Sequence, residues 1–177
     1  MKRVLIAGVG NILLGDDGVG PYVVRRLAAN YVFEEGIEIE DLGTPALDFV
    51  DHIGGLDALI VVDAVNNGEA PGTVAVYEKA DLLRHAPSVR MDPHSPALIE
   101  SLMAAEFYGG GPKEVWLVGV TGESYNAQCT LTPAVQAAVD QAVRQVLWML
   151  DRMDLGFVRR FDESDAAIWW LPEVVCA

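Results

Sequence analysis

Short apolar segments that alternate with helix-like segments limit the folds open to this chain more than any other feature. Three continuous apolar runs of strand length are expected to be strands covered on both faces: Arg3–Gly8, Ala58–Val62 and Val115–Val120. Segments with a helix-like pattern lie between and after them: Pro21–Asn30, Ala46–Ile53, Pro96–Phe107 and Pro133–Met153. This alternation predicts an α/β fold, a three-layer αβα sandwich around a twisted, mainly parallel sheet of about five strands.

Two further segments complete the predicted sheet. Ile37–Leu42 alternates apolar and acidic residues, so we expect a half-exposed or edge strand there. Thr73–Tyr77 has the composition of a strand, but the linker Ala64–Gly72 is shorter than the ~12 residues that a parallel crossover needs. We therefore expect Thr73–Tyr77 to be the one antiparallel strand of the sheet.

The length of 177 residues fits a single domain. We place this α/β domain at residues 1–154 and treat residues 155–177 as a C-terminal tail that packs on it. The tail holds a strongly apolar cluster, Ile168–Pro172, with two adjacent tryptophans. Packing against the domain is the first interpretation of this cluster, and a docking surface for a partner protein is the alternative.

Composition and charge exclude several classes of protein. A hydrophobic fraction of 51% is too high for intrinsic disorder, and a formal net charge of −14 makes nucleic acid an unfavourable partner. No run approaches the ~20 apolar residues of a membrane span, and the uncharged run Val4–Gly15 is interpreted as a strand and a loop rather than a signal peptide. Cys129 and Cys176 make no disulfide framework. We expect a reduced, cytoplasmic, monomeric protein that contacts no membrane.

The loop after the first strand carries the most informative motif. Its sequence is Gly8-Val-Gly-Asn-Ile-Leu-Leu-Gly-Asp-Asp-Gly-Val-Gly20. Leu13 stands where a dinucleotide-binding motif needs its third glycine, and Asp16 and Asp17 would repel a pyrophosphate. Two adjacent acids before a helix favour a cation instead. The alternative, that Asp16 or Asp17 only caps the helix, stays open at this point.

Two later residues extend the cation-site hypothesis. Asp63 ends the apolar run Ala58–Val62, and the ends of strands are the usual ligand position in α/β folds. The alternative is that Asp63 begins a turn. His94 lies in a segment fixed by two prolines, which suits a site that needs fixed geometry, although a loop histidine is often structural. His52 and His85 are expected to be solvated or half-buried.

Asp17, Asp63 and His94 come from three loops that this fold can bring to one edge of the sheet. Two carboxylates and one imidazole, with an open coordination position, suit a borderline divalent metal such as Ni²⁺ or Zn²⁺. The chain has no His-Glu-x-x-His motif and no cysteine cluster. The residues alone therefore predict a metal site without naming its function.

Taken together, the motifs resemble those of one enzyme family. The stretch Gly8–Gly20 closely resembles the N-terminal signature of the [NiFe]-hydrogenase maturation proteases. The segments Asp41–Thr44, Val62–Ala64 and the one around His94 resemble its later motifs, in the same order and at similar spacing. The resemblance covers residues 1 to about 151 of the chain.

This resemblance implies an αβα endopeptidase that removes a C-terminal extension from a hydrogenase large-subunit precursor after nickel has been inserted. It implies that Asp17, Asp63 and His94 contact nickel supplied by the substrate, with no organic cofactor. Many members have glutamate at the position of Asp17, so this ligand has a shorter arm here. Asp41 matches a further family acid, whose role the resemblance leaves open.

Two mechanisms are compatible with these residues, and two other functions compete with the endopeptidase, although Leu13 and the acidic pair argue against the nucleotide-binding one. Either the metal polarises the scissile carbonyl or acidifies the attacking water, or a carboxylate such as Asp41 acts as the base. A non-catalytic nickel-binding chaperone for hydrogenase assembly is the main alternative to an endopeptidase, and a nucleotide-binding oxidoreductase is the third class. Cys129, in the loop after the last core strand, is expected to be an incidental thiol rather than a nickel ligand.

Overall fold

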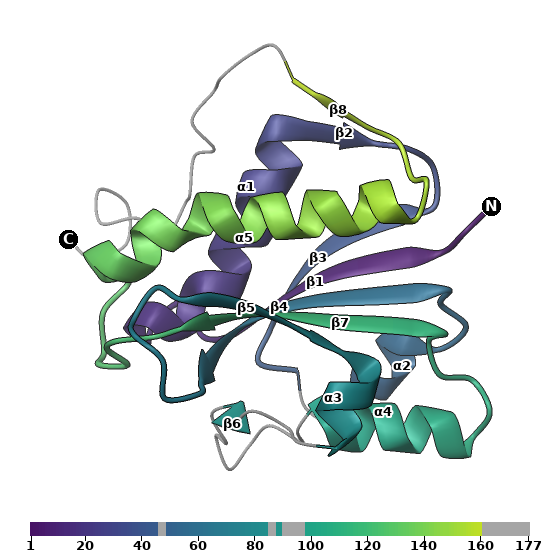
Figure 1. Ribbon diagram of the computed structural model, residues 1–177, viewed down its shortest axis with the longest axis horizontal. Coiled ribbons are helices and arrows are strands. Elements are labelled where there is room, and N and C mark those ends of the chain that lie inside the picture. Colours follow the sequence, from purple (N-terminus) through teal and green to yellow (C-terminus); the bar gives the residue numbers. More distant parts are fainter. Residues whose placement is uncertain (46–48, 85–87, 90–97, 161–177) are drawn as a thin grey trace.

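A mainly parallel sheet forms the centre of the computed structural model, which describes residues 1–45, 49–84, 88–89 and 98–160 (Figure 1). The strand order is β3 (Ile37–Gly43), β1 (Val4–Val9), β4 (Ala58–Asn66), β7 (Glu114–Thr121) and β5 (Val74–Glu78). The first four strands are parallel, and β5 is antiparallel to β7. A short strand, β6 (Ser88–Val89), pairs antiparallel with the end of β4. The predicted α/β fold, the edge strand and the antiparallel strand are confirmed.

Helices cover both faces of this sheet, because its central strands are apolar on both sides. The helices α1 (Val19–Asn30) and α5 (Pro133–Arg152) pack on one face, and α2 (Phe49–Ile53), α3 (Lys79–Arg84) and α4 (Leu98–Phe107) lie on the other (Figure 1). Successive residues of a strand point to opposite faces of the sheet, so they pack alternately in the two hydrophobic cores, one on each face. Ile60 and Val62 pack with α1 and α5, whereas Leu59 and Val61 pack on the opposite face.

The length of β4 differs most from the sequence prediction. The predicted strand stops before Asp63, but β4 continues to Asn66 because its last residues pair with β7. Pairing with β1 stops at Val62. Asp63 therefore lies inside the strand, at the point where β1 no longer pairs with it, and the alternative in which Asp63 begins a turn is wrong.

The predicted helices all occur, with small shifts of their ends. α1 begins at Val19 rather than at Pro21, and α5 agrees closely with the predicted range. The predicted helices Ala46–Ile53 and Pro96–Phe107 correspond to α2 and α4. Their first predicted residues, 46–48 and 96–97, lie outside the described residues.

A second sheet, of two strands, is absent from the sequence prediction. β2 (Tyr31–Phe33) pairs antiparallel with β8 (Phe157–Arg159), and the rings of Tyr31, Phe33 and Phe157 contact one another. β8 belongs to the segment 155–177 that the sequence predicts to be a tail. The apolar cluster Ile168–Pro172 lies outside the described residues. In the described part of the chain, no helix is long and apolar enough to cross a membrane.

Gly20 lets α1 lie close against the sheet. A Cβ at this position would lie 2.3 Å from the backbone oxygens of both Val9 and Val62. We expect Gly20→Ala to lower the free energy of unfolding by about 3 kcal/mol, because backbone atoms of two strands would have to move. Urea unfolding followed by circular dichroism measures this change.

Gly54→Ala is the matched control for this substitution, since a Cβ at Gly54 would meet no atom within 4 Å. Its free energy of unfolding should stay within about 0.5 kcal/mol of the wild-type value. Equal stability of Gly20→Ala and the wild type would contradict the close approach of α1 to the sheet.

Candidate active site

Two of the predicted site residues lie where β1 ends beside β4: Asp63 is in β4, and Asp17 is in the segment that follows β1. After β1 the chain forms a tight loop and a single 3₁₀ turn, η1 (Gly15–Gly18), which leads into α1. Gly10 has φ = 132°, and a Cβ there would lie 1.8 Å from the backbone oxygen of Asp17. Only glycine allows this close crossing, which brings Asp17 back towards the end of β1.

Asp17 and Asp63 are brought together at this edge of the sheet. The half-buried Asp17 accepts a hydrogen bond on Oδ2 from the backbone N–H of Asn11, at 2.9 Å. Asp63 is only 8% exposed, and its Oδ1 accepts the N–H of Ala64 at 2.7 Å. Burial raises the pKa of Asp63 well above its ordinary value, and the negative charge of Asp17 raises that pKa further. The two carboxylates therefore interact electrostatically.

Such a pair of carboxylates can lower its energy in two ways. One carboxyl group can keep its proton, or a cation can bind and compensate both negative charges. Groups with a pKa raised by burial and by a specific charged neighbour are typical of functional sites. The pair therefore favours a cation-binding or proton-transfer site at the end of β4.

The raised pKa of Asp63 predicts how stability changes with pH in the absence of metal. Between its pKa in the unfolded chain, about 4, and its higher pKa in the folded protein, the folded state holds more protons than the unfolded state. Stability is therefore lost as the pH rises through this window. Asp63→Asn removes this loss and keeps the oxygen that accepts the N–H of Ala64.

We accordingly expect metal-free Asp63→Asn to be more stable than the wild type at neutral pH, because the variant has no carboxyl group that must ionise in a buried place. Urea unfolding in the presence of a chelator, at about pH 5 and about pH 7, measures the difference. A variant that is less stable than the wild type at neutral pH would show that Asp63 is not destabilised by its surroundings.

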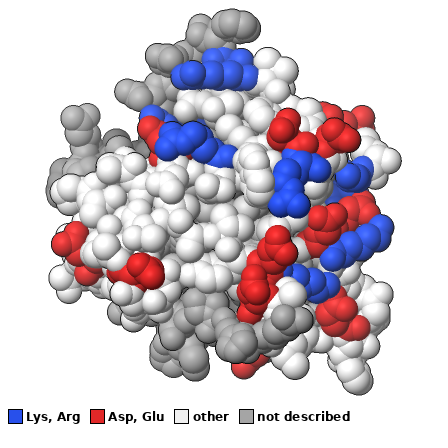
Figure 2. All heavy atoms as spheres, in the orientation of Figure 1, with Lys and Arg blue, Asp and Glu red and all other residues white. Residues whose placement is uncertain are grey.

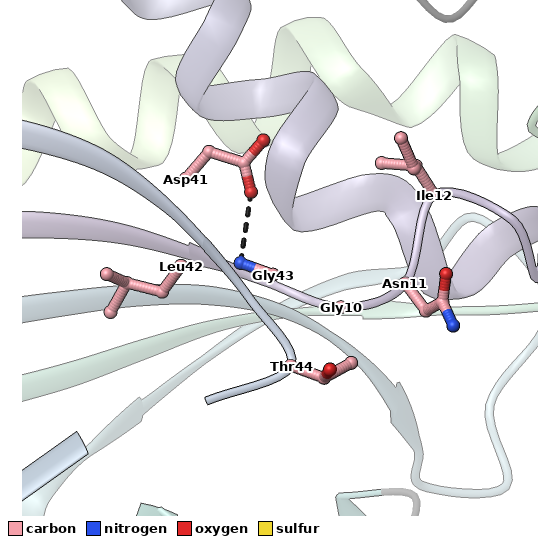
Figure 3. A pocket seen from close by; sticks show the side chains of 7 residues that line it. All are labelled: Gly10, Asn11, Ile12, Asp41, Leu42, Gly43 and Thr44. Carbon is pink, nitrogen blue, oxygen red and sulfur yellow. Dashed lines mark hydrogen bonds between the residues drawn. The ribbon is translucent and has the colours of Figure 1, made fainter. Parts of the chain in front are cut away.

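Asp41 lies on the other face of the sheet from Asp63. Along β3, Ile37 and Ile39 pack on the side of α1 and α5, and Asp41 continues this alternation. Asp63 shares its face with Val61 and Val65, the residues two positions before and after it, which pack on the side of α2, α3 and α4. Asp41 is exposed, and its Oδ1 accepts the backbone N–H of Gly43 at 3.1 Å (Figure 3).

An open hollow joins Asp41 to the loop that holds Asp17. The hollow has a volume of about 400 Å³ and is lined by Gly10, Asn11, Ile12 and the segment 41–44 (Figure 3). Asn11 is shared between the two features, because its backbone N–H binds Asp17. Asp41 thus shares a surface hollow with Asn11, the residue that binds Asp17, and is not a member of the carboxylate pair.

The remaining predicted ligand, His94, lies outside the described residues, and so does His85. His52 is partly exposed, and its Nδ1 lies 3.5 Å from a carboxylate oxygen of Glu40. Within the described ranges, no three His, Cys, Asp or Glu side chains come together as a group that could hold a metal ion. In the described part, the predicted ligand set is therefore represented by Asp17 and Asp63.

Asp16 has a role that the sequence analysis missed. It is fully buried, and its carboxylate accepts hydrogen bonds from Glu123, Ser124 and Thr132. Leu14 and Gly18 hold the N-cap positions of η1 and α1, and neither makes a side-chain capping bond. The contacts of Asp16 with residues 123–132 go beyond the capping alternative for this residue. The sequence does not show which of the two adjacent acids is buried, because both are aspartates.

On the face drawn in Figure 2, many surface charges gather over the end of the molecule where β1, β4 and β7 begin, at the right of the view, and acidic and basic side chains are mixed there. Ion pairs such as Lys113 with Asp57, at 2.6 Å, and Lys79 with Glu106 account for some of these charges. The net charge of the chain therefore does not by itself locate the site.

A family model described as hydrogenase maturation protease matches residues 21–149. The chain belongs to the hydrogenase maturation protease family. It is thus an endopeptidase, a hydrolase, as the sequence motifs predicted. A nucleotide-binding oxidoreductase, the third class considered, has no support from this match.

Named relatives and solved structures agree with this family. The chain is 36% identical to the hydrogenase 2 maturation protease of Escherichia coli K12 over 149 residues, which cover 82% of this chain and 88% of that protein. It is 39% identical over 167 residues to the hydrogenase expression/formation protein HupM of Azotobacter chroococcum, covering 93% and 80%. The hydrogenase maturating endopeptidase HybD from E. coli superposes with a TM-score of 0.82 at 34% identity, over 89% of this chain and 98% of that one.

Proposed function

We propose that this protease removes a C-terminal extension from the large-subunit precursor of a [NiFe]-hydrogenase after nickel has been inserted. In this proposal the enzyme recognises nickel that belongs to the substrate. The observation that carries the proposal is the buried Asp63 carboxyl next to Asp17, with its pKa raised by burial and by that neighbouring charge. A divalent cation presented by a substrate would compensate both carboxylates at once.

Selection for nickel follows from an incomplete ligand set. Asp17 and Asp63 contribute two carboxylate oxygens, and His94 is proposed as the third protein ligand. Cysteine thiolates of the precursor would supply the other ligands, so a precursor without nickel would place nothing between the two carboxylates. Docking is then strong only for the metal-loaded precursor, and the extension is removed only after nickel insertion.

Hydrolysis needs a water molecule that adds to the scissile carbonyl, after which the C–N bond breaks and the amine takes up a proton. Substrate nickel would lie close to this peptide and could polarise its carbonyl or acidify the water. Asp41 as the base is the second candidate, and its place in the hollow that Asn11 also lines requires the peptide to run along segment 41–44. A strong loss of kcat with an unchanged KM in Asp41→Asn would favour this second mechanism.

The intact mass of the precursor tests the proposed function. Wild-type enzyme is incubated with nickel-loaded and with nickel-free precursor, and we expect the mass of the extension to be lost only from the nickel-loaded form. A tight complex with nickel-loaded precursor at full length would instead support the non-catalytic chaperone. Equal cleavage of the two forms would contradict recognition of nickel.

A further inference from the structure

Asp16 connects the turn that carries Asp17 to a distant part of the chain. Its Oδ1 accepts the N–H of Thr132 at 2.7 Å, and its Oδ2 accepts the N–H groups of Glu123 at 2.8 Å and Ser124 at 2.9 Å. The hydroxyl of Thr132 donates a fourth bond to Oδ2, at 3.0 Å. All of these donors belong to residues 122–132, the β7–α5 loop. Both oxygens of this carboxylate, which is 0% exposed, thus accept hydrogen bonds from one loop.

Backbone hydrogen bonds run beside the side chain of Asp16 and join the same two segments. The N–H of Gly15 donates to the carbonyl of Gln128 at 2.8 Å, and that of Asp16 donates to Ser124 at 2.9 Å. In the other direction, the N–H of Gln128 donates to Leu13 at 3.1 Å. The β7–α5 loop therefore acts as the support on which residues 13–16 lie.

The turn η1 has little internal strength of its own. It contains four residues, and 3₁₀ turns of this length have poor hydrogen-bond geometry. Its first residue, Gly15, has φ = 58°, which adds no rigidity because glycine samples many conformations. The direction of the next side chain, Asp17, thus depends on how firmly Asp16 is held.

We propose that Asp16 is a positioning residue of this protease: its bonds to the β7–α5 loop hold η1 and thereby orient the Asp17 carboxylate towards substrate nickel. The orientation of Asp17 can be followed without metal, through the hydrogen bond that the N–H of Asn11 donates to Oδ2 of Asp17. The consequence for nickel rests on the proposed function. Asp16 itself touches neither substrate nor metal in this account.

Thr132 offers a mild way to loosen Asp16 without unfolding the protein. It stands at the start of α5 but makes no side-chain capping bond there, and its hydroxyl donates instead to Asp16. Thr132→Val has nearly the same shape and removes that one bond. Thr132→Ser restores the hydroxyl, and Thr130→Val is a matched change in the same loop.

Two measurements on the full-length protein test the inference. Hydrogen exchange of the Asn11 amide, followed by NMR without metal, should be about five-fold faster in Thr132→Val than in the wild type, the effect of one lost hydrogen bond. Exchange of the Gly43 amide, which binds Asp41, should not change. The preference for nickel-loaded over nickel-free precursor, measured as a ratio of dissociation constants, should fall by a similar factor.

Thr132→Ser should keep both wild-type values, and Thr130→Val should keep them too. Wild-type exchange and wild-type nickel preference in folded Thr132→Val would overturn the positioning role of Asp16. So would faster exchange at Asn11 and Gly43 alike, which indicates general loosening. If the wild type itself shows no nickel preference, the proposed function fails, and the Asn11 exchange alone decides whether Asp16 positions Asp17.

Discussion

Asp16→Ala is expected to lower the free energy of unfolding by about 4 kcal/mol, one of the largest effects of a single side chain in this protein. The substitution removes the acceptor of four hydrogen bonds and leaves three backbone N–H groups and a hydroxyl facing a cavity. For a chain of this length the midpoint of thermal unfolding should fall by roughly 10 °C. Differential scanning calorimetry measures both quantities.

Glu123→Ala is the matched control for this prediction. The side chain of Glu123 is exposed, and only its backbone N–H contacts Asp16, so the contact survives the substitution. Its stability should lie within about 0.5 kcal/mol of the wild type. If the free energy of unfolding of Asp16→Ala lay within about 1 kcal/mol of the wild-type value, the four hydrogen bonds of Asp16 would contribute little to stability.

Asp17→Asn, one residue away, is expected to lower the activity strongly and the stability little. We expect the rate of precursor cleavage to fall by about 100-fold or more, because a neutral amide is a poor ligand for nickel and no longer balances its charge. Stability should change little, since Asp17 is half-buried and the amide oxygen can still accept the N–H of Asn11. Single-turnover cleavage of nickel-loaded precursor gives the rate.

Two further variants show whether this loss is specific to the charge at Asp17. Asp17→Glu keeps the carboxylate, and the family resemblance places glutamate at this position in many members, so cleavage should be retained. Asp81→Asn removes an exposed acid on α3 and should also leave the rate unchanged. Cleavage by Asp17→Asn at the wild-type rate would remove Asp17 from the site.

The sequence predicts the central sheet well because its three middle strands, β1, β4 and β7, are continuous apolar runs. The prediction stops too early at Asp63, since a buried acid inside a strand looks like a strand end. β2 and β8 are missed because each has three residues and pairs with a partner far along the chain. Hydrophobic patterns report local burial, and they hold no information about such long-range pairing.

The sequence predicts which residues belong to the candidate site, but it predicts their arrangement in space only partly. The motifs correctly place Asp17 and Asp63 at one edge, because strands β1 and β4 are parallel neighbours whose carboxyl ends meet. The different roles of Asp16 and Asp17 depend on contacts of Asp16 with residues 123–132, more than a hundred positions later. The face on which Asp41 lies depends on the alternation of side chains along β3, which becomes clear only with the register of β1 and β3.

Asp63 gives the most direct test of the account, because function and stability should change in opposite directions. Wild-type enzyme and Asp63→Asn are incubated in parallel with nickel-loaded precursor, and the intact mass of the precursor is measured by mass spectrometry. The account predicts loss of the C-terminal extension with the wild type and full-length precursor with Asp63→Asn, although the variant is the more stable protein. Cleavage of the precursor by Asp63→Asn at the wild-type rate would contradict it.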